Sequence, residues 1–549
     1  MRSLCLALVL CSTVALARSR SVSATDSLEY FALKSAATLE SLEKAVKIYP
    51  MDGDVWYQLA QKRLQEKHYD AAIEAYQHVF ELGGFANKLF ASCHYDIACA
   101  YALKGDTKAA IASLQTSLDK GFRDLNHVQT DKDLESLHKD VKWEEMAATK
   151  DVSKMSRDEA WRYDLWLYNR EVRRIHLNPY QKSTKDELDK EVKSFNREIP
   201  KLSDHQIRMR FMRLAVLIGD GHTILRGFDP ATAKQAPITV FRFDDGYRII
   251  AIAKSKSALL GAKILQVAGH DAEEVLKASS PFIAKDNSMG DLAISPRYFT
   301  NADLLKGLGW LADTNEIGYV VEDVSGKKST LVLQTIAGPT PAADLAGIET
   351  SLPTVPLSLK DRAKPYWFEY LAETKTVYFQ YNSVRNITDL PVSKFAEKLF
   401  EFIQTNDVEN LVIDARWNGG GNTFLSRPLV NGIIASKKVN RPGHLFVITG
   451  RHTFSAAQNF VTDIERSCEA TFVGEPSGSS PNFTGESVLG VLPYSKMTYS
   501  ISDLHWQRSW PMDARTWIAP DLPAPPSFSD LRLGLDSAFE AIKAFLLKK

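Results

Sequence analysis

The sequence predicts a multidomain protein in which an all-helical N-terminal part is followed by a mixed α/β part. Two patterns support this fold class. Residues up to about 150 carry apolar side chains at helical spacing in a repeated pattern, and the last third alternates short apolar runs with helical segments. The length of 549 residues allows several domains, and 44% hydrophobic with 24% charged residues is an ordinary globular composition.

Charge balance and cysteine usage argue against several classes of partner and cofactor. Lys plus Arg and Asp plus Glu each total 67, so the net charge of zero gives no reason to expect nucleic acid or an anionic membrane as the main partner. After residue 24 only Cys93, Cys99 and Cys468 remain, too few for a disulfide framework, and no CxxC pair suggests zinc. We therefore expect neither a metal nor an organic cofactor.

The N-terminus is typical of a cleaved secretory signal peptide, which we place at residues 1–24. Arg2 precedes an apolar run at 4–10, and small-residue sites follow at 15–17 and 22–24. The apolar run is too short to span a bilayer, and no later stretch is long and apolar enough to do so. We expect a secreted or periplasmic protein that keeps no integral membrane segment after signal cleavage.

Residues 25–150 predict a stack of paired helices. Five positions of one copy recur in the next: Trp56, Leu59, Ala60, Ala72 and Tyr76 correspond to His94, Ile97, Ala98, Ala110 and Leu114. The pattern resembles the tetratricopeptide repeat, although its offset is slightly longer than the usual ~34 residues. Such repeats either hold a peptide or protein partner in a groove or form a scaffold without a ligand of its own, and both remain open.

The middle of the chain changes from helical to β-type patterning. Residues 151–235 are expected to be mostly helical and end in the motif Gly-Asp-Gly-His-Thr at 219–223. Residues 236–345 contain short β-type runs. A proline-rich stretch at 339–365 predicts a linker.

Residues 346–549 alternate strands and helices, which predicts an α/β layer with a largely parallel sheet. The expected strands include residues 377–381, 411–415, 445–448 and 470–474. In such sheets functional sites collect at the carboxyl ends of the strands. The residues that follow these four runs are therefore candidates for a catalytic or binding site.

A serine begins the helix after the run at 445–448, in the motif Gly-Arg-His-Thr-Phe-Ser at 450–455. At a helix start, a hydroxyl lies near unpaired backbone N–H groups and the positive end of the helix dipole. Both would stabilise the oxyanion of an acyl-transfer reaction, so Ser455 is a candidate nucleophile. The alternative is an ordinary N-cap, a position that serine favours.

Two further motifs could complete an acyl-transfer site. Glycines at 419–421, after the run at 411–415, can present backbone N–H groups in a concave turn, and no Gly-Lys-Ser/Thr follows to indicate a phosphate loop. His222 lies in the 219–223 turn, and an imidazole suits a general base near neutral pH. The alternative is a capping or surface histidine, as most of the twelve histidines must be.

The order of these motifs resembles the S41 peptidase family, which includes tail-specific proteases, tricorn core proteases and retinoid-binding relatives. The matching stretches are 219–223, 416–421, 453–460, 472–476 and 517–521, within a resemblance over roughly residues 155–545. The resemblance implies a serine-type endopeptidase that acts on protein or peptide substrates. It also implies a crotonase-like (ββα) catalytic core at 346–549, a PDZ-like β insertion at 236–345 and a helical part of the peptidase unit at 151–235.

The resemblance favours the histidine-containing branch of that family. Tail-specific proteases pair the serine with a downstream lysine in a Gly-Lys-Gly context, but the matching stretch 476–481 contains no lysine. The tricorn-like branch uses a histidine ahead of the PDZ-like region, and His222 matches that position. By resemblance, Ser455 is the nucleophile, His222 the general base, and the N–H groups of Gly420 and Ala456 the oxyanion hole.

The third catalytic residue stays open. By resemblance, an acid shortly before the Pro-Asp motif at 520–521 acts on the histidine through a neighbouring serine. Asp513 is the nearest such acid. The residue before His222 is Gly221, however, so the expected relay serine is missing. Glu486 and Asp220 are alternatives, and His452 is a rival general base. Two other functions also stay open: a retired protease fold that binds a ligand, and a scaffold whose repeats carry the function.

Overall fold

The computed structural model describes residues 22–82 and 87–548, and the chain divides into two units, 1–151 and 152–549. Most of the signal-peptide prediction, residues 1–21, lies outside the described residues, so it stays a prediction. Across the described ranges, no helix combines the length and apolarity needed to cross a membrane.

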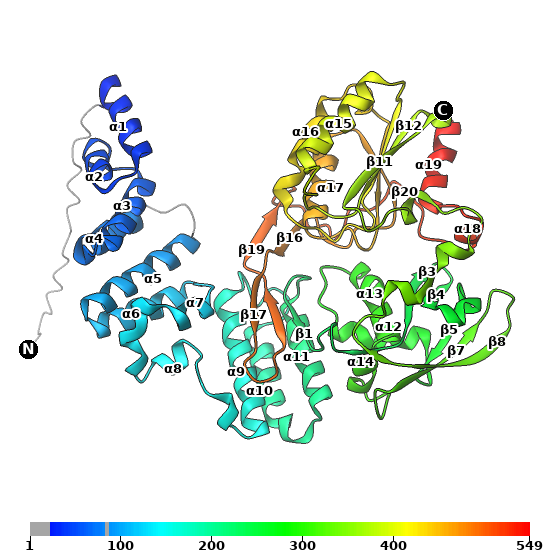
Figure 1. The fold of residues 1–549 in the computed structure, drawn as a ribbon, viewed down its shortest axis with the longest axis horizontal. Helices are drawn as coiled ribbons and strands as arrows, with labels where there is room; N and C mark the ends of the chain where they lie inside the picture. Colours follow the sequence, from blue (N-terminus) through cyan, green and yellow to red (C-terminus); the bar gives the residue numbers. More distant parts are fainter. Residues whose placement is uncertain (1–21, 83–86, 549) are drawn as a thin grey trace, which may run out of the picture. The chain divides into compact units, whose positions relative to one another are not determined.

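The N-terminal unit consists of helices joined by short turns (Figure 1). They are α1 Ala24–Ala36, α2 Leu39–Ile48, α3 Gly53–Gln65, α4 Tyr69–Glu81, α5 Asn87–Lys104, α6 Thr107–Asp119, α7 Leu125–Thr130 and α8 Trp143–Met146. Helix α3 pairs with α4, and α5 with α6. The small residues of the repeated pattern, Ala60, Ala72, Ala98 and Ala110, are all fully buried. This is the close helix packing that the sequence predicts, while the tetratricopeptide assignment remains a prediction.

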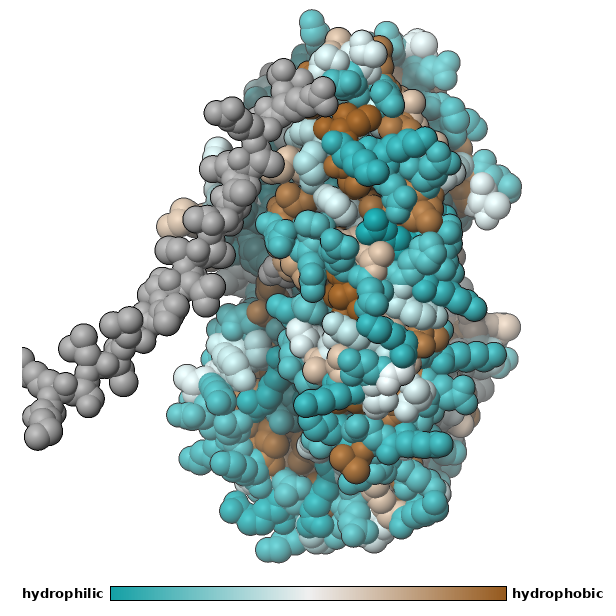
Figure 2. All heavy atoms as spheres, turned by 90° about the vertical axis from the view of Figure 1, so that its left-hand side faces the viewer, coloured by the Kyte–Doolittle hydropathy of each residue, from teal (hydrophilic) through white to brown (hydrophobic). Residues whose placement is uncertain are grey.

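Figure 2 shows one face of the molecule, on which hydrophilic side chains cover most of the area and hydrophobic ones lie between them. The exposed large hydrophobic residues of the N-terminal unit include Leu28, Phe31 and Met51. Scattered apolar side chains of this kind are normal on protein surfaces and do not mark a partner.

Three helices open the second unit: α9 Arg157–Ile175, α10 Lys185–Glu198 and α11 Asp204–Ile218. Each begins with a capping box, in which Ser156, Thr184 and Ser203 accept a hydrogen bond from the third helical residue. Helix α11 ends at Gly219, whose φ of 98° is a left-handed conformation that glycine tolerates. The chain then turns through His222 into strand β1 (Ile224–Arg226), which pairs with β18 (Thr498–Ile501).

The β insertion forms a sheet in the order β10-β4-β5-β7-β8, with β3 also paired to β4. The strands are β3 Ile238–Phe243, β4 Gly246–Ala253, β5 Lys263–Val267, β7 Glu316–Glu322, β8 Lys328–Gln334 and β10 Leu345–Gly347. Helices α12 Ala272–Ser279, α13 Met289–Ile294 and α14 Ala302–Gly307 belong to the same segment (Figure 1). The linker prediction for 339–365 is wrong at β10, because β4 has an edge with which this stretch forms an antiparallel ladder.

The C-terminal core is a six-stranded sheet in the order β11-β12-β13-β14-β15-β20. Its strands are β11 Tyr366–Leu371, β12 Thr376–Tyr381, β13 Asn410–Asp414, β14 Leu445–Thr449, β15 Ala470–Gly474 and β20 Leu522–Pro523. Strand β11 is antiparallel to β12, and the remaining pairs are parallel. The predicted α/β layer with a largely parallel sheet is therefore present.

Helices cover both faces of this sheet (Figure 1). Helices α15 Val392–Thr405, α16 Arg427–Ala435 and α17 Ala456–Ser467 lie on one face, and α19 Ser537–Leu547 lies on the other. Side chains alternate between the two cores, since Val377 and Phe379 pack under α15 whereas Tyr378 packs under α19. The parallel strands thus end at one edge of a buried sheet, where the candidate residues lie.

Candidate active site

Ser455 lies in a strained turn between β14 and α17. Its backbone has φ 56° and ψ −126°, a conformation sparsely populated by residues other than glycine, and such strain costs about 1–3 kcal/mol. The residue occupies the N-cap position of α17, but its hydroxyl makes no capping hydrogen bond. A capping serine such as Ser156 instead has an extended backbone and a bonded hydroxyl. Ser455 therefore stands at the N-cap position without the side-chain hydrogen bond of a capping serine.

The turn before Ser455 is tied to its neighbours by short polar contacts. Thr453 Oγ1 donates to Ala415 O at 2.9 Å and accepts from Gly450 N at 3.1 Å. The N–H of Phe454 donates to Asn418 O at 3.0 Å. The bonds to Ala415 and Asn418 join the turn after β14 to the loop after β13, and the Gly450 bond closes the turn itself.

The glycine-rich loop lies directly against Ser455. A Cβ placed on Gly420 would lie 2.7 Å from Ser455 Cβ and 2.9 Å from Ala456 N, and its φ of 107° also favours glycine. In the described part of the chain the Ala456 N–H has no hydrogen-bond partner. The Gly420 N–H donates to Asn418 Oδ1 at 2.9 Å. The structure thus brings both predicted oxyanion-hole residues to Ser455, one with its N–H engaged within the loop.

His222 lies beside the Ser455 turn through ring stacking. Its imidazole stacks on Phe454, with ring centroids 4.5 Å apart, and on Phe483 at 5.4 Å. Both ring nitrogens are buried, and neither has a hydrogen-bond partner among the described residues, so the His222–Ser455 bond of a dyad is not formed. Burial lowers the pKa of His222 to about 4, against a smaller opposing effect of Asp220. The imidazole is therefore neutral near pH 7.

Asp220 holds the backbone of the His222 turn. Its Oδ1 accepts the N–H groups of His222 at 2.9 Å and Thr223 at 2.6 Å, and the hydroxyl of Ser502 at 2.7 Å. Its Oδ2 lies 2.9 Å from His176 Nε2. Burial alone would raise the pKa of this carboxyl, but the bonds from His176 and Ser502 hold it below its ordinary value. Asp220 fixes the turn and does not bond to the His222 ring.

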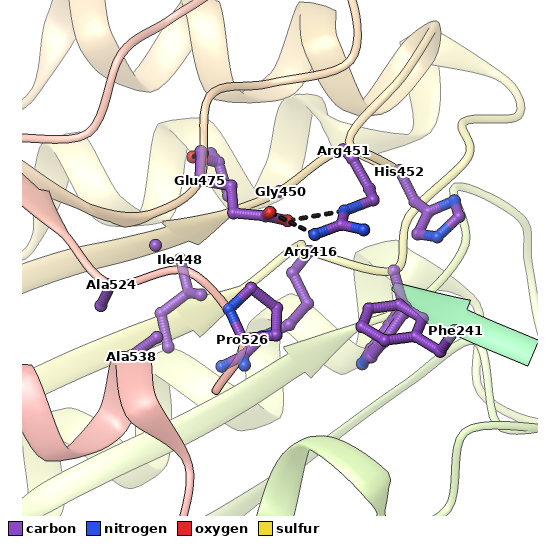
Figure 3. A pocket seen from close by; sticks show the side chains of 13 residues that line it. Phe241, Arg416, Ile448, Gly450, Arg451, His452, Glu475, Ala524, Pro526 and Ala538 are labelled. Carbon is purple, nitrogen blue, oxygen red and sulfur yellow. Dashed lines mark hydrogen bonds and ion pairs between the residues drawn. The ribbon is translucent and has the colours of Figure 1, made fainter. Parts of the chain in front are cut away.

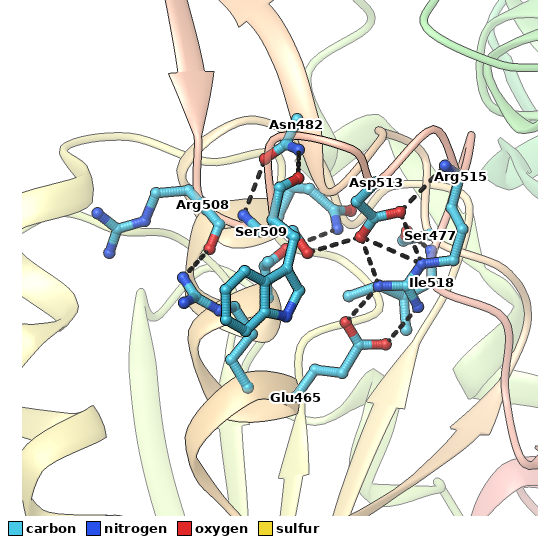
Figure 4. Close-up of polar contacts among 12 residues, drawn as sticks. Glu465, Ser477, Asn482, Arg508, Ser509, Asp513, Arg515 and Ile518 are labelled. Carbon is cyan, nitrogen blue, oxygen red and sulfur yellow. Dashed lines mark hydrogen bonds and ion pairs between the residues drawn. The ribbon is translucent and has the colours of Figure 1, made fainter.

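Asp513 forms a separate polar network (Figure 4). Its carboxylate accepts the Ser509 hydroxyl at 2.6 Å and pairs with Arg515, which also pairs with Glu465. The bond from Arg515 holds the pKa of Asp513 well below its ordinary value. Since the ring nitrogens of His222 have no partner in the described structure, Asp513 does not bond to them. In this network Asp513 stabilises the loop to which it belongs.

The remaining candidates also lie apart from the His222 ring nitrogens. Glu486 is exposed, in the turn between β16 (Asn482–Gly485) and β17 (Val488–Val491). The His452 side chain lines a pocket with Phe241, Arg416 and Trp417 (Figure 3). Burial and, to a lesser degree, the nearby Arg451 lower the pKa of His452 to about 4. Figure 3 also shows Arg451 paired with Glu475, and both side chains are buried.

Two residues that the sequence analysis missed bond to the loops around His222. Asp286 Oδ1 accepts the Gly221 N–H at 2.6 Å, and its other oxygen accepts the Ser479 hydroxyl. Asn287 Nδ2 donates to Ser477 O at 3.1 Å and to Thr516 O at 2.7 Å. No motif marks these two residues, because their partners are 65 or more positions away in the chain.

Comparison with known proteins identifies the fold. No protein-family model and no curated protein matches the sequence. Mature CPAF complexed with lactacystin aligns with a TM-score of 0.52 and 13% identity, over 71% of this chain and 97% of the CPAF chain. This chain has the fold of the S41 peptidases. Mature CPAF alone gives a TM-score of 0.51 at 13% identity, over 71% and 98% of the two chains.

A more distant match is the photosystem II D1 C-terminal processing protease, with a TM-score of 0.34 and 12% identity over 70% of this chain and 99% of that one. The CPAF alignments, and not this weaker one, confirm at the level of the fold the resemblance drawn from the motif order. At 13% identity the chemistry has to be argued from the site itself.

Proposed function

We propose that this chain is a serine-type endopeptidase of the S41 kind, which hydrolyses protein or peptide substrates through an acyl-enzyme at Ser455. The observation that carries the proposal is the strained Ser455 backbone at the start of α17, with an uncapped hydroxyl packed against Gly420. Strained strand–turn–helix connections of this kind expose nucleophilic serines. A purely structural serine would gain nothing from the strain.

His222 is the proposed general base. Attack of Ser455 Oγ on the scissile carbonyl forms the Oγ–C bond while the hydroxyl proton moves to the imidazole, which then protonates the leaving amine. Both ring nitrogens of His222 are unpartnered among the described residues and the ring is neutral, so a nitrogen lone pair is open to the hydroxyl proton, although burial makes the imidazole a weaker base. Its stacking on Phe454, the neighbour of Ser455, supports this role, and catalytic hydrogen bonds are often formed only once a substrate binds.

The oxyanion is proposed to bind the N–H groups of Ala456 and Gly420. The Ala456 N–H is the first of α17, where the helix dipole adds to the hydrogen bond. The Gly420 N–H becomes available when the Asn418 side chain, 2.9 Å away, releases it. Water then attacks the acyl-enzyme with His222 again as base, and Ser455 is restored.

Ser455→Ala tests the proposal. Labelling by a fluorophosphonate–fluorophore probe and cleavage of fluorescent casein should both be lost. Ser156→Ala is the matched control, because Ser156 is a capping serine at a helix start and should lose stability, by about 1 kcal/mol, but not labelling. If Ser455→Ala were labelled and cleaved casein as the unchanged protein does, the nucleophile would be wrong.

A ligand-binding protein on the same fold is the second candidate. It is favoured by the missing His222–Ser455 bond and by a largely apolar pocket with a cavity volume of about 80 Å³, lined by Phe243, Ile250 and Trp417 among others. This candidate requires that the unchanged protein resist the fluorophosphonate probe and bind an apolar fluorophore saturably. Labelling of Ser455 would reject it.

The N-terminal part is proposed to act outside the chemistry. Residues 1–24 would direct the chain to a secreted or periplasmic location, and the paired helices of 25–150 would dock a partner or a substrate protein through tetratricopeptide-like repeats. Sequencing the N-terminus of protein recovered from the culture medium or periplasm tests the first assignment. An unprocessed Met1 on that protein would contradict it.

A further inference from the structure

The loop before α13 connects the β insertion to the catalytic region. Asp286 bonds to Gly221 and Ser479, and Asn287 bonds to the carbonyls of Ser477 and Thr516. These partners lie in three loops of the catalytic region: the turn after α11, the loop after β15 and the segment before β20. Two adjacent side chains of the insertion therefore hold together loops that are far apart in sequence.

Resting on the proposed function, we propose that Asp286 is a positioning residue that holds the Gly221–His222 turn against the Ser479 loop and so sets the His222 imidazole beside Ser455. Three successive N–H groups of this turn donate to two carboxylates. Gly221 donates to Asp286, and His222 and Thr223 donate to Asp220. The bonds to the ionised Asp220 are charge-assisted and about twice as strong as neutral ones, and together with the Asp286 bond they hold the backbone of the turn that carries the His222 ring.

Close packing around Gly221 explains why Asp286 contacts this residue through its backbone N–H. A Cβ on Gly221 would lie 2.8 Å from Phe454 Cζ and 3.0 Å from Asp286 Oδ1. No serine fits at this position without displacing one of the two. The relay serine that the family resemblance leads us to expect would therefore require Phe454 or Asp286 to shift. Asp286 bonds to the N–H of the same residue instead.

The charges around Asp286 are few. The titratable groups of the surrounding elements are Asp220 and His222 on the turn, Lys182, which packs on Gly219, and Lys285 with its ion-pair partner Asp291. The Ser479 loop contributes hydroxyls at 477, 479 and 480. Burial raises the pKa of Asp286 to about 7, against the opposing bonds from Ser479 and Gly221. Its ionised form, above that pH, favours the imidazolium that forms on His222 during attack.

Two substitutions of Asp286 separate its geometry from its charge. Asp286→Ala removes both bonds and should lower kcat/KM for casein about 100-fold, the effect of displacing a catalytic group by about 1 Å. Asp286→Asn keeps an acceptor for the Gly221 N–H, so its kcat/KM at pH 6 should stay within about threefold of that of the unchanged protein. The unchanged protein should show a rise in kcat/KM centred near pH 7, as Asp286 ionises, and Asp286→Asn should lack this rise. The lowered pKa of His222 leaves Asp286 as the source of that rise.

Asp323→Asn is the matched control. Asp323 also lies in the β insertion, and its carboxylate accepts the backbone N–H groups of Ser325 and Lys327 and the Ser325 hydroxyl in the turn between β7 and β8. Its substitution should leave kcat/KM and the pH profile unchanged. Loss of activity in both variants to the same extent would mean that the insertion as a whole is damaged, which would overturn the assignment.

A readout without turnover separates this inference from the proposed function. The His222 ring signals, assigned in 13C-histidine NMR spectra through His222→Gln, should move in Asp286→Ala and not in Asp323→Asn. Unmoved signals would overturn the positioning role whatever the activity. If the unchanged protein cleaves casein and Asp286→Ala retains a third or more of its kcat/KM, the inference fails and the peptidase assignment stands. If the unchanged protein neither labels nor cleaves, the peptidase assignment fails.

Discussion

Gly420→Ala is the most direct test of the geometry around Ser455. The added Cβ would lie 2.7 Å from Ser455 Cβ, 2.9 Å from Ala456 N and 3.0 Å from Phe454 O. Carbon atoms pack at about 3.5–4.0 Å, so the glycine loop and the Ser455 turn must separate by at least about 0.8 Å. The φ of 107° at Gly420 adds backbone strain for any residue with a side chain.

The expected consequence is a loss of about 100-fold in the rate of fluorophosphonate labelling, because catalytic groups displaced by about 1 Å lose that much. Gly419→Ala is the control, since a Cβ at Gly419 meets no heavy atom within 4 Å and its φ is not positive. It should keep the labelling rate within about threefold. Circular dichroism checks that both variants are folded. A folded Gly420→Ala that labelled as fast as Gly419→Ala would refute the contact between this loop and the nucleophile.

Three further predictions concern the strain, the histidine and the buried ion pair. Ser455→Gly should unfold in urea with a free energy about 1 kcal/mol higher than Ser455→Ala, because glycine tolerates the positive φ; equal values would mean that the turn is unstrained. The pKa of His222 is lowered from 6.5 to about 4 in the folded protein, so the unfolded chain binds the proton first as the pH falls. Relative to His222→Gln, the unchanged protein should therefore lose up to about 3 kcal/mol of stability between pH 6.5 and 4. The same pH dependence of the urea unfolding free energy in both proteins would contradict this. Arg451→Met leaves the buried Glu475 unpaired and should cost about 3–5 kcal/mol, whereas Arg451→Met/Glu475→Gln should lose less; equal losses would show that the ion pair is unimportant.

The sequence predicted those parts of the site that depend on local patterns. A strand followed by a turn and a helix places Ser455 at the start of α17, and the glycines at 419–421 follow β13. Both lie at strand ends of one parallel sheet, so their proximity follows from the alternation of strands and helices. The same patterns could not distinguish a capping serine from a strained one, because backbone dihedrals at a single residue depend on what surrounds the turn.

The sequence left the third catalytic residue open between Asp513, Glu486 and Asp220, and of these only Asp220 bonds to the backbone of the His222 turn. Distance along the chain from the Pro-Asp motif points to Asp513, but Asp513 is bonded to Ser509 and Arg515. Asp286, which does bond to the histidine turn, lies in the β insertion, where no motif marks it. Its partners come from other loops, and only the packing of the insertion on the catalytic region brings them within hydrogen-bond distance.

The sequence by itself determined the division into helical, β and α/β parts, the order of the S41-like motifs and the absence of a lysine at 476–481. These are local or sequential properties, set by side-chain periodicity and by residue identity. The tertiary structure decided the strain at Ser455, the unpartnered state of the His222 nitrogens among the described residues, and the hydrogen bond between Asp286 and Gly221. Each of these depends on contacts between segments far apart in the chain, whose free energies no local pattern contains.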